Sequence, residues 1–337
     1  MKHQKLSNNK PRVSIGMPVF NGEKYLEEAL DSILAQTYQD FELIISDNAS
    51  TDHTQQICIE YANKDNRIHY YRNKKNIGAP RNYNRVFELS SGEYFKWAAY
   101  DDVLAPNYLE KCVIVLDNNS SVVLCHCKTG RIDEHGTLVG YYNQGMLRHT
   151  SSPKPNERFA DLIGLWYNTC PIFGLVRASL FRKTPLHGSY IGSDRNLLAE
   201  IGLMGRIYEI PECLFFQRDH PESYTSIYYG HKQSPTVNRL RKEMAWWSKD
   251  YWTSFPYWKN CIEYFRSVNR VPLNWSERLL CYAQIFRWLL EREGWLFLVR
   301  DMKMFLLHNS RVARKLFPFV LLNLRRTVIP IIKKMRR

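Results

Sequence analysis

Two adjacent carboxylates, Asp101 and Asp102, follow a short aromatic and apolar run at residues 94–99. The run begins after the Ser-Ser-Gly at residues 90–92 and predicts a buried strand with both acids at its carboxyl end. In open α/β sheets, ligands bind outside the carboxyl ends of the strands. Two hard oxygen donors in this place could hold Mg²⁺ or Mn²⁺ against a diphosphate. The alternative is that one acid caps the helix predicted at residues 108–116.

A third acid, Asp47, ends another mainly apolar run at residues 41–47. A carboxylate at a strand end can accept a hydrogen bond from a pyrimidine N–H, so Asp47 is our candidate for contacting a nucleotide base. The alternative is an aspartate that serves only the following turn or helix cap. The sequence contains neither G-x-G-x-x-G nor a P-loop motif, so a glycine-rich phosphate loop is not supported.

The elements that position these acids alternate along the chain. Strands are predicted at residues 13–20, 41–47 and 67–71. Helices are predicted at residues 23–34, from the cap residues at 48–52 to about residue 62, and at residues 79–89. This alternation predicts an α/β fold with a mostly parallel sheet and helices on both faces. After residue 121 the pattern is more mixed, with short strands predicted at residues 122–125 and 173–176.

Three more polar residues lie at predicted element ends. Asp194 follows Gly192 and Ser193 and is placed to cap a helix at residues 196–204. A strand that begins near residue 208 ends in Arg218 and His220. An isolated histidine is more often structural, whereas one that follows an arginine at a strand end suits a phosphate or a metal.

The distribution of charge and the cysteine content indicate which surfaces the protein meets and whether its thiols are reduced. The 337 residues carry a net charge of +14, and residues 231–337 hold 22 basic and 7 acidic residues, against 25 and 26 in the first 230. Of the eight cysteines only Cys125 and Cys127 are close, and no second pair completes a zinc site, so we expect reduced core thiols. We see no secretory signal and no apolar run long enough to span a membrane, and we expect a cytoplasmic protein.

The order of five motifs resembles family 2 glycosyltransferases, which are inverting enzymes with the nucleotide-sugar-binding fold called GT-A. The motifs together span about residues 12–222, and their order and spacing are more specific than any one of them. They are Val13-Ser-Ile-Gly-Met-Pro-Val-Phe-Asn21, Asp47-Asn-Ala-Ser-Thr-Asp52, Asn76-Ile-Gly78 with Arg81-Asn82, Asp101-Asp102-Val-Leu-Ala-Pro106, and Gly192-Ser-Asp194 followed by Arg218-Asp-His220.

For the nucleotide, the resemblance implies that Pro18, Phe20 and Glu23 line the pocket and that Asp47 binds the base. It places Arg81 near the nucleotide or its diphosphate. One departure falls here, because Asn48 stands where the family often has a second acid after Asp47.

For the reaction, the resemblance implies that Asp194 is the general base and that Arg218 and His220 contact the diphosphate. Asp101 matches the last acid of the family's D-x-D signature, and Asp101, Asp102 and His220 are the implied ligands of Mn²⁺ or Mg²⁺. Asp101 also counts among the nucleotide-binding residues. A second departure lies here: Ala99 or Tyr100, depending on register, replaces the first acid, so fewer protein ligands would hold the metal.

We divide the chain into a polar tail at residues 1–11, a GT-A catalytic domain at 12–229 and a basic helical region at 230–337. That last region holds seven of the nine tryptophans, and ten cations but no acid follow Asp301. Residues 275–307 and 312–332 predict amphipathic helices. Aromatic anchors beside cations suit an anionic membrane surface. A solvated basic face over an ordinary helical core, or a dimer interface, are the alternatives.

The expected function is transfer of a sugar from a nucleotide-sugar donor, with UDP favoured, to a hydroxyl of a saccharide acceptor. A polyprenyl-linked acceptor and a role in cell-surface polysaccharide synthesis would suit an enzyme on the inner face of the cell membrane. The alternative is a non-catalytic nucleotide-sugar-binding or scaffold protein of the same fold. We do not expect a nucleic-acid partner, because no recognition motif accompanies the charge. The sequence leaves the sugar, the linkage and the oligomeric state open.

Overall fold

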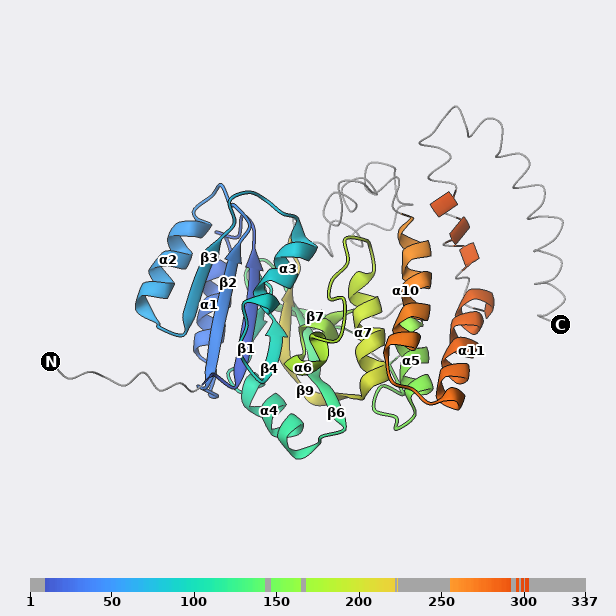
Figure 1. Cartoon of the computed structure of the whole chain (residues 1–337). Helices are drawn as coiled ribbons and strands as arrows, with labels where there is room; N and C mark the ends of the chain where they lie inside the picture. The colour runs from blue at the N-terminus through green and yellow to red at the C-terminus, as the bar shows by residue number, and fades with distance from the viewer. Residues whose placement is uncertain are drawn as a thin grey trace, which may run out of the picture.

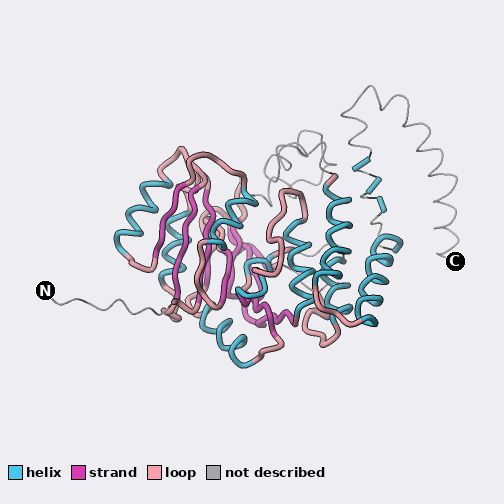
Figure 2. Tube along the Cα trace, viewed as in Figure 1, coloured by secondary structure: helices cyan, strands magenta, loops and turns pink. Residues whose placement is uncertain are grey.

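The computed structural model describes residues 10–142, 147–164, 168–221, 223, 255–291, 295–296, 298–299 and 301–302. In these ranges one sheet has the strand order β3-β2-β1-β4-β8-β6-β9-β5, and β7 pairs with β6 (Figure 1). Helices cover both faces of the sheet (Figure 2). The predicted α/β class with helices on both faces of the sheet is confirmed. The sheet was predicted to be mostly parallel, and this holds for the half that contains β1 to β4, whereas four of the other strand pairings are antiparallel.

Four parallel strands form the first half of the sheet. They are β1 (Val13–Val19), β2 (Phe41–Asp47), β3 (Ile68–Arg72) and β4 (Tyr94–Trp97). Every residue of β1, β2 and β4 is buried, as expected for strands covered on both faces. The register pairs Val19 with Asp47 and Asp47 with Arg72, so these strands end together at one edge of the sheet.

Two hydrophobic clusters lie on opposite faces of this half. The first packs α1 (Leu26–Leu34), α2 (Thr54–Lys64) and α4 (Tyr108–Asn118) against alternate residues of β1 and β2. In α1 the buried Leu26, Leu30 and Ile33 recur at helical spacing, which explains why this segment forms an amphipathic helix. The second cluster includes α3 (Ala79–Glu88), in whose first turn Pro80 lies.

The second half of the sheet is mixed. It contains β5 (Val103–Leu104), β6 (Val122–Ile132), β7 (Leu138–Tyr141), β8 (Leu175–Arg177) and β9 (Arg206–Arg218). Because β4 ends at Trp97 and β5 pairs with Phe215 and Phe216 of β9, the segment with Asp101 and Asp102 is a tight connection beside the end of β9. Phe173, predicted to be in a strand, ends the 3₁₀ helix η1 (Cys170–Phe173) instead.

Four helices lie together beside the mixed half (Figure 1): α5 (Pro155–Ile163), α7 (Ser193–Met204), α10 (Pro256–Arg270) and α11 (Trp275–Glu291). The short α6 (Ala178–Phe181) precedes the loop that leads to α7. The carboxylate of Glu200, in α7 and 1% exposed, pairs with Arg270 and accepts a hydrogen bond from Ser267 Oγ at 2.7 Å. Helix α10 of the basic region therefore shares a core with the preceding elements.

The predicted helix from Trp275 is confirmed as far as Glu291, with helical residues again at 295–296, 298–299 and 301–302. The helix predicted at residues 312–332 lies outside the described part of the chain. None of the helices that the structure describes combines the length and the apolar character needed to cross a membrane. All eight cysteines are free, as expected, and Cys125 and Cys127 are buried in the same hydrophobic cluster.

Candidate active site

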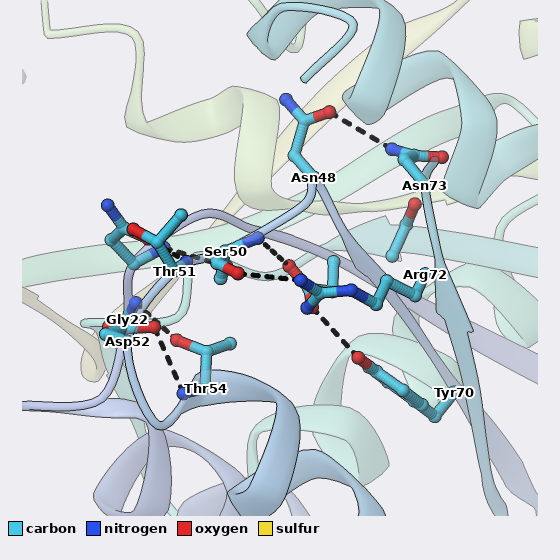
Figure 3. Close-up of polar contacts among 12 residues, drawn as sticks. Gly22, Asn48, Ser50, Thr51, Asp52, Thr54, Tyr70, Arg72 and Asn73 are labelled. Carbon is cyan, nitrogen blue, oxygen red and sulfur yellow. Dashed lines mark hydrogen bonds and ion pairs between the residues drawn. The ribbon is translucent and has the colours of Figure 1, made fainter. Parts of the chain in front are cut away.

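Asp47 lies at the carboxyl end of β2 with its side chain fully buried. Its Oδ1 accepts the Ser50 N–H at 2.8 Å, and its Oδ2 accepts the Tyr70 hydroxyl at 2.9 Å. Arg72 forms an ion pair with the same carboxylate and donates to Ser50 O at 2.7 Å (Figure 3). A nucleotide base that reached Asp47 would therefore have to take the place of one of these donors.

Beside Asp47, asparagine side chains form a hydrogen-bonded group at the carboxyl ends of β2 and β3. Asn48 Oδ1 accepts from Asn73 Nδ2 at 3.1 Å and from the Ile77 N–H at 2.9 Å (Figure 3). Asn82 Nδ2 donates to Ser46 O at 2.7 Å, and its Oδ1 accepts from Asn73 Nδ2 at 2.9 Å. Asn48 Nδ2 also donates to Asn76 Oδ1 at 3.0 Å, a bond to the loop after β3 that an ionised acid at this position could not make because a carboxylate only accepts.

The end of β1 and the turn after it carry three of the predicted nucleotide contacts. Pro18 is buried in β1, whereas the Phe20 side chain is 41% exposed and Glu23 is exposed. Glu23 accepts the His53 N–H at 2.9 Å, which joins this turn to the start of α2. A Cβ on Gly22 would lie 2.8 Å from the Tyr100 ring, so a glycine is needed for the turn to approach the acidic connection. Arg81, the other predicted contact, is exposed on α3.

Asp101 and Asp102 have different surroundings. Asp101 Oδ2 lies 3.0 Å from His220 Nε2, and Asp101 is half-buried. Asp102 is 7% exposed, and its Oδ1 accepts the backbone N–H of Arg218 at 3.0 Å. Burial and the neighbouring charge of Asp101 raise the pKa of Asp102 well above its usual range. Neither acid caps α4, whose N-cap is Asn107.

Arg218 connects this acidic pair to the rest of the site. Its side chain is 1% exposed, and it donates from Nε to Asp101 O at 2.9 Å and from Nη1 to Asp133 O at 3.2 Å. Its Nη2 donates to Glu28 Oε2 at 2.6 Å. The guanidinium also lies 4.9 Å from the ring centroid of Tyr25. The predicted contact of Arg218 with a diphosphate would require these bonds to open, and the structure instead gives this side chain a positioning role.

Glu28 and Tyr25 were not identified from the sequence. The Tyr25 ring contacts both Arg218 and His220, with a centroid distance of 4.7 Å to the imidazole. Both residues belong to the first turn of α1 or its cap and resemble ordinary amphipathic-helix residues. No local pattern marks them, because their partners come from the end of β9.

Asp194 is the second residue of α7, and the N-cap is Gly192 in the left-handed region with φ of 82°. The prediction that Asp194 is the N-cap was therefore wrong by two residues. Glycine tolerates a positive φ that would strain most other residues, which leaves Asp194 in the first turn. Its Oδ1 accepts the Arg195 N–H at 2.8 Å, and the residue is half-buried.

Tyr83, on α3, lies among the acids that the sequence predicts for the reaction. Burial raises the pKa of Tyr83, and the negative charges of Asp101, Asp102 and Asp194 raise it further. The Tyr83 ring also packs against Trp97 of β4 at a centroid distance of 6.1 Å. The fold thus brings the β4–β5 connection and the start of α7 around one tyrosine.

The residues present fit a divalent metal only in part. Asp101 and His220 offer an oxygen and a nitrogen donor 3.0 Å apart, which suits Mn²⁺. Asp102 has one oxygen committed to the Arg218 N–H, which leaves only its other oxygen for a metal. Within the described part of the chain, no group of three His, Cys, Asp or Glu side chains is arranged to hold a metal ion.

Acids at the end of β2 and just beyond the end of β4, with an aspartate in the first turn of α7, are the arrangement expected of a glycosyltransferase of the GT-A class. The chain belongs to glycosyl transferase family 2, whose family model matches residues 14–183. An uncharacterized glycosyltransferase of Rickettsia typhi is 37% identical over 241 residues, which are 71% of each chain. One of Haemophilus influenzae is 29% identical over 243 residues, covering 70% of this chain and 73% of the relative.

Solved structures support the fold. The Staphylococcus aureus protein TarS, residues 1–349, in complex with UDP superposes with a TM-score of 0.58 at 17% identity, over 82% of this chain and 71% of that one. Its complex with UDP-GlcNAc gives the same TM-score at 19% identity, over 82% and 72%. The expected GT-A fold and the family resemblance are confirmed.

Proposed function

We propose that the protein transfers a sugar from a nucleotide-sugar donor, with UDP favoured, to a hydroxyl of a saccharide acceptor, with inversion at the sugar C1. The observation that carries this proposal is that Asp101, in the β4–β5 connection, and Asp194, in the first turn of α7, both lie close enough to Tyr83 for their charges to raise its pKa. A displacement needs a leaving diphosphate and an attacking hydroxyl on opposite sides of C1, and this arrangement offers a group for each.

The steps follow from these positions. Asp194 takes the proton of the acceptor hydroxyl as that oxygen forms a bond to C1. The bond between C1 and the diphosphate oxygen breaks, and the electron pair leaves with the nucleoside diphosphate. One base suffices, because the diphosphate leaves without needing a proton. Asp101 and His220 would hold Mn²⁺ or Mg²⁺, which when bound neutralises charge on the diphosphate.

The donor class is tested by thermal unfolding of the protein with UDP-, GDP- and dTDP-sugars, each with Mn²⁺ and with EDTA. A ligand at 100 times its Kd stabilises the folded state by about 2.7 kcal/mol. We expect a metal-dependent shift with one nucleotide, and we expect Asp101→Ala to lose it.

Asp65→Ala is the matched control, because Asp65 pairs with Arg67 before β3, at the opposite edge of the sheet, and this variant should keep the shift. If no nucleotide sugar stabilises the wild-type protein, either with Mn²⁺ or with EDTA, the proposed catalysis is contradicted and the scaffold alternative is favoured. That alternative is motivated by Ala99 and Tyr100, where the family has its first acid.

For the acceptor and the location, we propose a lipid-linked saccharide and peripheral attachment to an anionic membrane on the cytoplasmic side. Support comes from apolar side chains that α11 leaves exposed and from the basic residues that follow this helix in the sequence. Trp275 is 76% exposed, Leu279 58% and Phe286 55%. Partial insertion of such side chains together with nearby cations is the usual basis of interfacial binding.

The membrane proposal predicts that the full-length protein sediments with vesicles containing anionic phosphatidylglycerol. Trp275→Ser with Leu279→Ser should lower the bound fraction several-fold without lowering the unfolding temperature, because both side chains are already exposed. Ile114→Ser on α4, where Ile114 is 52% exposed, is the matched control and should bind as the wild type does. Equal sedimentation with neutral phosphatidylcholine vesicles would contradict selectivity for an anionic surface, and no sedimentation with either kind of vesicle would contradict peripheral attachment.

A further inference from the structure

His187 is a buried histidine in the loop between α6 and α7, seven residues before Asp194. It is 8% exposed. Its backbone N–H donates to Asn84 Oδ1 at 2.9 Å, and its carbonyl accepts from Asn84 Nδ2, also at 2.9 Å. The ring packs against Trp97 at 4.7 Å and edge-on against Tyr83 at 5.3 Å between centroids. Helix α3 and strand β4 therefore fix the position of the imidazole.

The Nε2 atom of His187 is buried and has no hydrogen-bond partner among the described residues. A buried polar atom without a partner costs about 1–3 kcal/mol, so a phenylalanine would pack here at a lower cost. Burial lowers the pKa of His187 to about 4, an effect that the nearby charge of Asp194 partly opposes. At neutral pH the ring is therefore uncharged, with one nitrogen that donates and one that accepts.

The His187 ring lies close to the acids that we propose for the reaction. Tyr83, which His187 contacts, also lies within the electrostatic reach of Asp101 and Asp194. If Asp101 serves the leaving diphosphate and Asp194 the attacking hydroxyl, the transferred sugar must lie between them. His187 then borders the sugar rather than the nucleotide base, which belongs at Asp47 on the other side of β1.

We propose that His187 Nε2 forms a hydrogen bond with a hydroxyl group of the transferred sugar and so helps to select which sugar the enzyme accepts. This proposal rests on the proposed function. It explains why a polar atom is kept unpaired in a buried aromatic cluster beside the general base: the partner arrives with the substrate. A site built to hydrogen-bond a substrate hydroxyl discriminates strongly against analogues that lack it.

The test compares His187→Phe with His126→Phe in the full-length protein. His126 is a second buried histidine, 4% exposed and with its pKa likewise lowered to about 4 by burial, but its Nδ1 lies 3.2 Å from Cys127 O, away from the site. Calorimetry measures binding of the nucleoside diphosphate alone and of the nucleotide sugar that stabilises the wild type. We expect His187→Phe to weaken binding of the nucleotide sugar about tenfold, to leave the diphosphate unchanged and not to lower stability.

His126→Phe should leave both affinities unchanged. His187→Leu also lacks the nitrogen and serves if the phenylalanine variant does not fold, and His187→Gln should restore part of the affinity because its amide can bond a hydroxyl. Unchanged sugar affinity in a folded nitrogen-free variant would overturn the proposal, as would an equal loss for both ligands or a change confined to the acceptor KM. Failure of the wild type to bind any nucleotide sugar would instead contradict the proposed function, and this inference with it.

Discussion

Replacing Asp194 by asparagine is expected to lower kcat by at least about 100-fold while nucleotide-sugar affinity stays close to the wild-type value. General-base assistance contributes about 10²–10⁴-fold, and an amide cannot take the proton from the acceptor hydroxyl. Asparagine has nearly the same shape, and its Oδ1 can still accept the Arg195 N–H that Asp194 accepts at 2.8 Å. The first turn of α7 should therefore remain intact.

The measurement is steady-state turnover together with calorimetric donor binding. Asp161→Asn on α5 is a suitable control, because Asp161 accepts the backbone N–H of His149 and lies outside the proposed site. If Asp194→Asn keeps turnover near the wild-type rate, Asp194 serves only the helix and another group must act as the base. A parallel loss of donor affinity and turnover would indicate that Asp194 contacts the donor instead.

Replacing Arg218 by glutamine is expected to lower the free energy of unfolding by about 2–4 kcal/mol and to abolish most donor binding. The substitution removes the hydrogen bonds to Asp101 O, Asp133 O and Glu28, and the contact with the Tyr25 ring. The lower end of this range allows for Glu28, whose side chain is 52% exposed and can be solvated once its partner is lost. Loosening the Asp101 backbone should also disturb its contact with His220.

This experiment separates two roles for Arg218. If the side chain is a structural support, urea unfolding of Arg218→Gln without nucleotide should show the lower free energy of unfolding. If Arg218 only binds the diphosphate, the substitution should leave the stability of the ligand-free protein nearly unchanged. Arg131→Gln is the matched control, since Arg131 pairs with Asp219 on the same pair of strands but is 43% exposed. We expect it to cost less than about 1 kcal/mol. Equal stability of Arg218→Gln and wild type would contradict the positioning role.

Several features of the site were predictable because they depend on short segments. The apolar run at β2 and the one at β4 predict buried strands, and a parallel sheet places their carboxyl ends at one edge, so Asp47 and Asp101 were expected there. Asp194 was expected at the start of a helix. Its exact place was missed because a glycine in the left-handed region, Gly192, takes the cap.

Other features depended on contacts between distant segments. Glu28 and Arg218 are 190 residues apart in sequence, and Asp101 and His220 are 119 apart. Which side chains meet across such distances depends on the register of β9 beside β6 and β5 and on how α1 packs over the sheet. That packing buried the Arg218 side chain against Asp101 O, Asp133 O and Glu28, and its contact with a diphosphate stays a prediction.

The sequence by itself determined the class of fold, the family and the position of the acids at the strand ends, because periodicity and turn residues act over a few neighbouring positions. Only the tertiary structure decided which groups surround those acids. It buried Asp102 against the backbone of Arg218 and brought Tyr25 into contact with Arg218 and His220. It also left Nε2 of His187, near Asp194, without a hydrogen-bond partner among the described residues. These arrangements follow from burial and long-range packing, which residue type and local spacing do not encode.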